Sequence, residues 1–230
     1  MDKELLEFLT RVDTPTICGA IEVVQGRRGF NGFTRGTMVC TEPGRAVVGF
    51  AVTAQIAALA PPTEQPEVIR ARRIAYYKAM HDAPKPSVAV IEDMDYPNCM
   101  GAYWGEVNTT IHKGFGMSGA LTNGVVRDLG DLPQGFPVIA GSIGPSHGYV
   151  HVRSIGRSVR VMGLEVRQGD LVHADRHGAV VVPPEVIAPL AAAIRKLQNT
   201  ERLILDPARR PGFDFAAFEA AWAAFEKART

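Results

Sequence analysis

The chain of 230 residues has few cysteines, no long apolar run and no excess of charge of either sign. Its three cysteines, Cys18, Cys40 and Cys99, are odd in number and widely spaced, so we expect reduced thiols and neither a disulfide framework nor a zinc site. No segment approaches the roughly 18 apolar residues that a membrane-spanning helix needs. The N-terminal MDKELLEFLTRVD is charged and amphipathic and lacks the apolar core of a signal peptide. We therefore expect a cytoplasmic protein without a membrane partner.

The charges are almost balanced, with 25 Lys and Arg against 24 Asp and Glu. Partners such as DNA are held largely by an excess of positive charge, so the balance argues against a nucleic-acid partner. With 46% hydrophobic and 21% charged residues, the composition is typical of a soluble globular protein. We see no linker, repeat or low-complexity tract, and residues 1–230 are therefore predicted to form a single domain.

Helical periodicity alternates with short apolar runs along the first 140 residues. This alternation is typical of βαβ units and predicts a largely parallel sheet with flanking helices. The predicted helices are residues 2–12, 13–24, 63–83 and 100–116, and the predicted strands are residues 45–58, 86–93, 118–126 and 136–142.

The pattern changes after Gly148. Residues 148–183 hold short alternating segments separated by turns, which predicts antiparallel hairpins and hence a mixed sheet. A helical tail is expected from about residue 185 to 230. Its last part carries one apolar stripe, formed by Phe215, Phe218, Trp222 and Phe225.

Three motifs point to chemistry only weakly. GPSHG (144–148) matches a nucleophile elbow, but a strand-like segment follows it where that motif requires a helix. GRRGFNG lacks the strand-to-helix context of a dinucleotide fingerprint. The pairs His147/His151 and His173/His177 are four residues apart, but along a strand that spacing is about 13 Å, too far for one metal ion. We interpret these histidines as strand and surface residues, although the turn between His173 and His177 leaves the second pair open.

The stretch TNGVVRDLGD places Arg127 and Asp128 side by side after an apolar run. Asn-Gly is a common hairpin turn, so one interpretation is a hairpin with a charged exit. The alternative is the carboxyl end of a parallel strand, where residues line a ligand crevice. A carboxylate-binding guanidinium beside an acid that can hold Mg²⁺ suits a 2-oxo acid and its enolate.

The segment PNCMGAYWGEV faces the same crevice if the strand order holds. It is predicted to open a helix, whose free N–H groups attract carboxylates. Gly101 and Gly105 would let the backbone approach a ligand closely. Glu106 falls in the first helical turn, where it either joins the site or only complements the helix dipole.

Taken together, these residues resemble the family of class II 4-hydroxy-4-methyl-2-oxoglutarate aldolases and RraA-like proteins. The resemblance runs from about residue 10 to 205 and rests on WGEV, NGVVRD and GDLVHADRHGAVVVP, with PGRAVVGFAVTAQ and TPTICGAIE as further landmarks. It implies an α/β sandwich close to the swivelling phosphohistidine domain, assembled as a homotrimer or as a homohexamer of two trimers. It also implies a lyase that releases pyruvate from 4-hydroxy-2-oxo acids and decarboxylates oxaloacetate.

The resemblance also implies roles for individual residues. Arg127 would hold the pyruvyl carboxylate and stabilise the enolate, and Asp128 would bind Mg²⁺ or Mn²⁺ directly. Glu106 would hold a water bound to the ion, and the Val107 amide would lie near the substrate carboxylate beside Gly105. For a contribution from a neighbouring subunit we name Glu201.

Two positions depart from the family pattern, since Gly19 and Asn123 stand where Asp is common. These departures, with Tyr103, Trp104 and His147, are the candidates for an altered substrate preference. The alternative functions are an RraA-like regulator that binds ribonuclease E, and a metal-dependent decarboxylase or lyase acting on another hydroxy acid. Asp128 favours the enzyme, because the resemblance implies that the regulators lack the metal-binding Asp.

Overall fold

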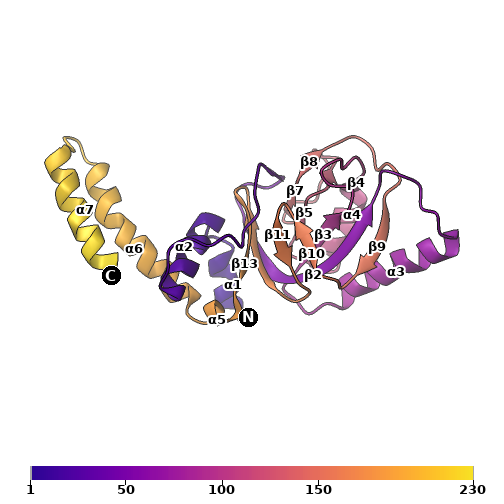
Figure 1. Ribbon diagram of the computed structural model, residues 1–230, viewed down its shortest axis with the longest axis horizontal. Helices are drawn as coiled ribbons and strands as arrows, with labels where there is room; N and C mark the ends of the chain where they lie inside the picture. The colour runs from indigo at the N-terminus through magenta and orange to yellow at the C-terminus, as the bar shows by residue number, and fades with distance from the viewer. Residues whose placement is uncertain (1, 230) are drawn as a thin grey trace.

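A curved eight-stranded mixed sheet forms the centre of the protein, in a computed structural model that describes residues 2–229 and the side chains of residues 2–228 (Figure 1). Seven strands follow the order β1-β7-β5-β3-β2-β12-β13, and β9 pairs with the free part of β2. The four strands β2, β3, β5 and β7 are parallel, as the βαβ pattern predicted, and β1, β9, β12 and β13 are antiparallel additions. The strands of this sheet are β1 (Val39–Cys40), β2 (Val47–Ala57), β3 (Ser87–Asp93), β5 (Ala120–Thr122), β7 (Val138–Ala140), β9 (His151–Ile155), β12 (Leu171–Asp175) and β13 (Gly178–Val182).

Two smaller sheets cover the large one. A parallel three-stranded sheet has the order β4-β6-β8, with β4 at Ala102–Trp104, β6 at Val125–Val126 and β8 at Ser142–Ile143. The hairpin of β10 (Val159–Val161) and β11 (Leu164–Val166) packs on the opposite face. The predicted hairpins after Gly148 are therefore confirmed for β10–β11 and for β12–β13.

The two faces of the sheet bury different side chains, as the period of two along a strand requires. In β3, Ala89 and Ile91 face a core under α3 (Pro66–Asp82) and α4 (Glu106–Gly114). Val88 and Val90 of the same strand face the β10–β11 hairpin. The sheet is consequently buried on both sides, which explains its nearly continuous apolar strands.

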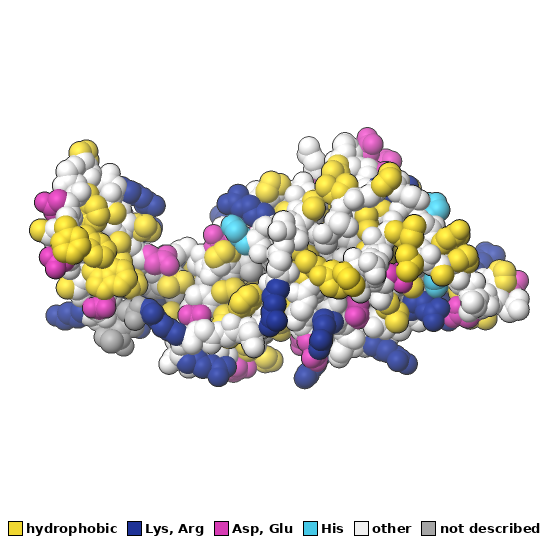
Figure 2. Space-filling view, turned by 45° about the horizontal axis from the view of Figure 1, so that its top comes forward, with side chains coloured by type: hydrophobic (Ala, Val, Ile, Leu, Met, Phe, Trp, Pro, Cys, Tyr) yellow, Lys and Arg dark blue, Asp and Glu magenta, His cyan; other side chains and the backbone are white. Residues whose placement is uncertain are grey.

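The remaining helices lie at the other end of the sheet and extend away from it (Figure 1). A second core joins α1, α2, α5 and the start of α6 to β12 and β13. Helix α7 packs back on α6, so the two form an arm (Figure 1), and hydrophobic side chains gather on that arm in Figure 2. The aromatic rings of the stripe on α7 follow one another with centroids 5.5 to 5.8 Å apart, and Phe215 and Trp222 are exposed. These helices are α1 (Lys3–Leu9), α2 (Thr14–Gln25), α5 (Pro184–Ile187), α6 (Leu190–Ala208) and α7 (Phe215–Arg229). The arm confirms the predicted helical tail.

Two expectations from the sequence were wrong. Residues 100–116 do not form one helix. Residues Ala102–Trp104 form β4, with the side chains of Ala102 and Trp104 buried, and α4 starts only after its N-cap residue, Gly105. The predicted strand over residues 118–126 is divided in two: β5 belongs to the large sheet and β6 to the small one, so the chain changes sheets at Asn123 and Gly124. Of the two interpretations of the Asn-Gly pair, the hairpin is therefore excluded. The chain makes the same change between β7 and β8, at Gly141.

No helix within the described residues combines the length and the apolar composition that crossing a bilayer requires.

Candidate functional site

Two neighbouring strands of the small sheet bring the predicted site residues together. β4 and β6 pair in parallel, and the Arg127 amide donates a hydrogen bond to the Trp104 carbonyl at 2.8 Å. Gly105 follows β4 directly and Arg127 follows β6 directly. The carboxyl ends of parallel strands meet at one edge, so the start of α4 and the Arg127-Asp128 pair lie side by side.

Asp128 caps helix α4 from outside the helix. Gly105 occupies the N-cap position and has no side chain to offer, and the Asp128 Oδ2 accepts a hydrogen bond from the Glu106 amide at 3.1 Å. Arg127 Nε lies 3.5 Å from the same oxygen, and both side chains are one third exposed. The carboxylate is thus held between a helix N-terminus and a guanidinium.

Gly105 is required by this packing. A Cβ at this position would lie 2.5 Å from Asp128 Oδ2 and 2.9 Å from Arg127 Nε. No side chain larger than hydrogen leaves the pair in place. The absence of a side chain at Gly105 therefore allows Arg127 and Asp128 to lie against the start of α4.

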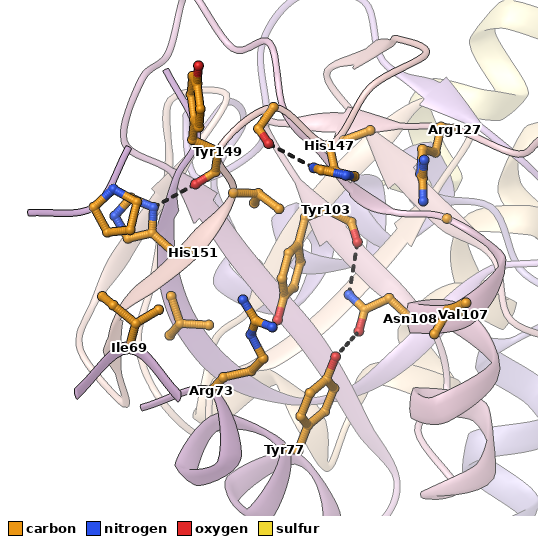
Figure 3. Close-up of a pocket in the computed structure, with 16 residues that line it drawn as sticks. Ile69, Arg73, Tyr77, Tyr103, Val107, Asn108, Arg127, His147, Tyr149 and His151 are labelled. Atoms are coloured by element: carbon orange, nitrogen blue, oxygen red, sulfur yellow. Dashed lines mark hydrogen bonds between the residues drawn. The ribbon is translucent and has the colours of Figure 1, made fainter. Parts of the chain in front are cut away.

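A cavity of about 450 Å³ opens beside Arg127 (Figure 3). Helix α3, β4, the start of α4 and the segment before β9 form its wall. The Val107 side chain lies at its edge and is 69% exposed. Its polar lining holds two arginines, two histidines, three tyrosines and an asparagine, and no described lining residue carries a carboxylate: Arg73, Arg127, His147, His151, Tyr77, Tyr103, Tyr149 and Asn108.

Helix α3 supplies lining residues that the sequence did not single out. Ile69, Arg73 and Tyr77 are spaced four apart and all line the cavity. Residues at i, i+4 and i+8 share a helix face, so the sequence spacing could have predicted that these three side chains lie together. Tyr77 donates a hydrogen bond to Asn108 Oδ1 at 3.2 Å, and Asn108 Nδ2 donates to the Tyr103 carbonyl at 3.0 Å.

Trp104 lies in the core and does not line the cavity. Its ring is fully buried and packs on His112, with ring centroids 4.8 Å apart. His112 in turn accepts a hydrogen bond at Nε2 from the Tyr76 hydroxyl at 2.7 Å, because its Nδ1 donates to the Asn108 carbonyl. Burial lowers the pKa of His112 to about 4. This neutral aromatic cluster fixes α4 against α3.

Of the two histidine pairs noted in the sequence, His173 and His177 make contacts that stabilise the fold. His173 is buried between Thr14 Oγ1 and the Leu9 carbonyl, each 3.0 Å away, and burial lowers its pKa. His177 bonds instead to Asp175 of the same hairpin. The remaining pair, His147 and His151, lines the cavity.

The two departures from the family pattern lie away from the cavity. The side-chain amide of Asn123 accepts from the Asp93 amide at 2.7 Å and donates to the Asp93 carbonyl at 3.0 Å. Gly19 of α2 faces α6, where an added Cβ would lie 2.7 Å from Leu197 Cδ2. Glu201 lies on α6 beside the same helix contact, in a second groove. Its predicted role in a neighbouring subunit stays a prediction.

Asp128 is the carboxylate best placed to hold a metal ion. Its Oδ2 is engaged by the helix, and its side chain remains partly open to solvent. No group of three or more His, Cys, Asp or Glu residues able to hold a metal occurs within the described part of the chain. Mg²⁺ needs no such group, since it binds through one or two carboxylates and keeps its remaining oxygens from water and substrate. The donor set therefore fits Mg²⁺ better than Zn²⁺.

The chain belongs to the RraA-like family, whose model, described as Aldolase/RraA, matches residues 14–181. "Uncharacterized protein MJ0644" of Methanocaldococcus jannaschii is 30% identical over 105 residues, which make up 45% of this chain and 50% of that protein. The chain thus spans about half the length of that relative. A Halalkalibacterium halodurans protein named "Putative 4-hydroxy-4-methyl-2-oxoglutarate aldolase" is 25% identical over 186 residues, 80% of each chain.

The fold also matches a solved RraA structure. Streptomyces coelicolor RraAS2, described as an unusual member of the RNase ES inhibitor RraA protein family, superposes with a TM-score of 0.65 at 22% identity. The match covers 91% of this chain and 98% of that one. At 22% identity, this match shows that the two proteins share a fold.

Proposed function

We propose that this protein is a divalent-metal-dependent aldolase that cleaves 4-hydroxy-2-oxo acids of the 4-hydroxy-4-methyl-2-oxoglutarate type into pyruvate and a second 2-oxo acid, and that it also decarboxylates oxaloacetate. The observation that carries the proposal is the Arg127-Asp128 pair held against the start of α4 at a cavity without lining carboxylates. The family membership and the name of the Halalkalibacterium halodurans relative support it.

Arg127 has the position to bind the anionic end of the substrate. Its guanidinium lines the cavity, and the Val107 amide lies in the first turn of α4, where N–H groups have no intrahelical acceptor. Paired donation from a guanidinium suits a carboxylate, and the same charge stabilises the enolate that forms when the C3–C4 bond breaks.

Asp128 would hold Mg²⁺ or Mn²⁺ directly, and Glu106 would act through a water. Such an ion, when bound, supplies Lewis-acid stabilisation of charge on the keto oxygen. Cleavage also requires the C4 hydroxyl to lose its proton. Glu106 is exposed at the same helix start, and we assign it the acid–base role, with a water between its carboxylate and the hydroxyl.

The test is a coupled assay of pyruvate release over a panel of 4-hydroxy-2-oxo acids and oxaloacetate, with Mg²⁺, with Mn²⁺ and with a chelator. We expect turnover that the chelator abolishes and either ion restores. Turnover that the chelator leaves unchanged would remove the metal from the proposal. If no compound in the panel is turned over and the protein instead captures ribonuclease E, it acts as a regulator.

We further propose that the active form is a homotrimer or a pair of trimers, in which Glu201 reaches a neighbouring site. The exposed aromatic stripe on α7 is an apolar surface of the kind that oligomers bury. Sedimentation velocity distinguishes monomer, trimer and hexamer. Mixing Glu201→Gln chains with inactive Asp128→Asn chains then tests whether sites are shared between subunits.

A further inference from the structure

Arg73 is a cation on the cavity wall whose charge the fold leaves unmatched. Its neighbour Arg72 donates to Glu64 at 2.7 Å and to the Val152 carbonyl at 3.1 Å. Arg73 itself makes no hydrogen bond or ion pair within residues 2–228, and it lines the cavity. One of the two adjacent arginines therefore stabilises the fold, and the other is available to a ligand.

The helix geometry directs Arg73 toward the cavity. It lies between Ile69 and Tyr77 on the face of α3 that lines the cavity, and Figure 3 shows its guanidinium beside the Tyr103 ring. Burial raises the pKa of Tyr77 and of Tyr103, and the positive charge of Arg73 opposes that rise at both hydroxyls. The Tyr103 hydroxyl is buried and has no hydrogen bond of normal geometry within the described residues.

The cavity thus has a cation in two separate places. Arg127 enters beside the start of α4 and Arg73 enters from α3, with Tyr103 between them in the view of Figure 3. None of the described lining residues is acidic. A ligand with one carboxylate neutralises one guanidinium and leaves the other unpaired, whereas a ligand with a carboxylate at each end neutralises both.

We propose that Arg73 is a specificity-determining residue that binds the distal carboxylate of a dicarboxylic 2-oxo acid, with the Tyr103 hydroxyl as a second donor. The orientation of the ligand, with its 2-oxo end on Arg127, rests on the proposed function. The site then selects substrates by the charge at the end that leaves as the second 2-oxo acid. A five-carbon backbone with carboxylates at C1 and C5 has this charge distribution.

Binding without turnover gives the first test. 2-Oxoglutarate and 2-oxopentanoate differ at C5, where the first carries a carboxylate and the second a methyl group. Both lack the 4-hydroxyl that cleavage requires. In titration calorimetry with Mg²⁺ present, we expect Arg73→Gln to weaken 2-oxoglutarate binding about tenfold, the effect of one partly exposed charge-assisted hydrogen bond, and to change 2-oxopentanoate binding less than twofold.

Two further variants serve as controls. Arg70→Gln removes an exposed arginine one turn away on α3 that does not line the cavity, and it should bind both ligands as the wild type does. Arg73→Lys keeps the charge and should keep most of the affinity for 2-oxoglutarate. Equal affinity of the wild type for the two ligands, equal weakening of both by Arg73→Gln, or no weakening of either overturns the inference.

Kinetics separate this inference from the proposed function. With 4-hydroxy-4-methyl-2-oxoglutarate, Arg73→Gln should raise KM about tenfold at nearly constant kcat. With 4-hydroxy-4-methyl-2-oxopentanoate, which releases pyruvate and acetone, the variant should match the wild type. A wild type that turns over neither compound defeats the aldolase proposal, while the binding experiment still decides the role of Arg73.

Discussion

The Asp128 carboxylate accepts a hydrogen bond from the Glu106 amide at 3.1 Å, so the residue proposed to hold the metal also caps the helix whose first turn lines the cavity. One side chain connects the strand end to the helix start. The distance between Arg127 and the first amides of α4 is therefore set by the same contact that orients the carboxylate.

Replacement of Asp128 separates its two roles. Asp128→Asn keeps an oxygen that can cap α4 and removes the charge, so we expect a normal thermal unfolding curve and a loss of metal-dependent pyruvate release of at least about 100-fold. Asp128→Ala should lose the cap as well and be less stable than Asp128→Asn by about 0.5–2 kcal/mol. Full activity of Asp128→Asn in Mg²⁺ would contradict the metal role.

Gly105→Ala should damage the site more than the fold. The added Cβ would lie 2.5 Å from Asp128 Oδ2 and displace the carboxylate and Arg127 together. We expect kcat/KM for pyruvate release to fall at least about tenfold, since positioning errors of this kind are costly in catalysis. Gly114→Ala, at the other end of α4 with nothing near the new Cβ, is the matched control and should stay active. Equal activity of the two variants would show that the contact tolerates a methyl group.

Asn123→Asp should lower stability without changing substrate preference. An ionised carboxylate accepts from the Asp93 amide but cannot donate to the Asp93 carbonyl, and both groups are buried. The expected cost is about 1–3 kcal/mol in the free energy of unfolding, measured by urea denaturation. A changed ratio of kcat/KM values between two substrates, with unaltered stability, would return Asn123 to the list of specificity residues.

Gly19→Asp should loosen the contact between α2 and α6. Its Cβ would approach Leu197 Cδ2 to 2.7 Å, so the helices must move apart or Leu197 must change rotamer. We expect a lower Tm for Gly19→Asp and partial recovery in Gly19→Asp/Leu197→Ala, measured against Leu197→Ala alone. Additive effects in this double-mutant cycle would show that the two residues do not interact.

His112 should make stability depend on pH. Burial lowers its folded pKa from 6.5 to about 4, so the unfolded chain takes up the proton first as the pH falls. The stabilisation is complete above pH 6.5 and is lost between pH 6.5 and 4, by up to about 3 kcal/mol. His112→Gln should flatten the pH dependence of the free energy of unfolding over this window. Parallel curves for the wild type and the variant would show that folding leaves the pKa of His112 unchanged.

The parallel part of the sheet and the helical tail could be predicted because period and turn residues are local signals. Residues 86–93 are a short apolar run between Pro and acidic residues, and they became β3. The predicted helix over 100–116 was wrong at its start because Trp104 is held by its pairing with β6, which begins 21 residues further along the chain. No local sequence pattern indicates that Trp104 pairs with a strand this far along the chain.

The candidate site was predicted only in part, for a similar reason. Arg127 and Asp128 adjoin in the sequence, and Glu106 opens a helix with a recognisable start. Arg73 is 54 residues from Arg127, in a helix whose charges look like an ordinary solvated face. Only the packing of α3 beside β9 brings it to the cavity.

The backbone at Asp128 has a φ of 55°, a conformation in which Asn, Asp and Gly are the most comfortable residues. Capping α4 restricts the residue at position 128 to Asn or Asp, and the proposed binding of a cation would restrict it to Asp. An Asp codon becomes an Asn codon by a single nucleotide change. Under the proposed function, one such change at position 128 would remove the metal-binding carboxylate while the fold and the cap of α4 stay in place.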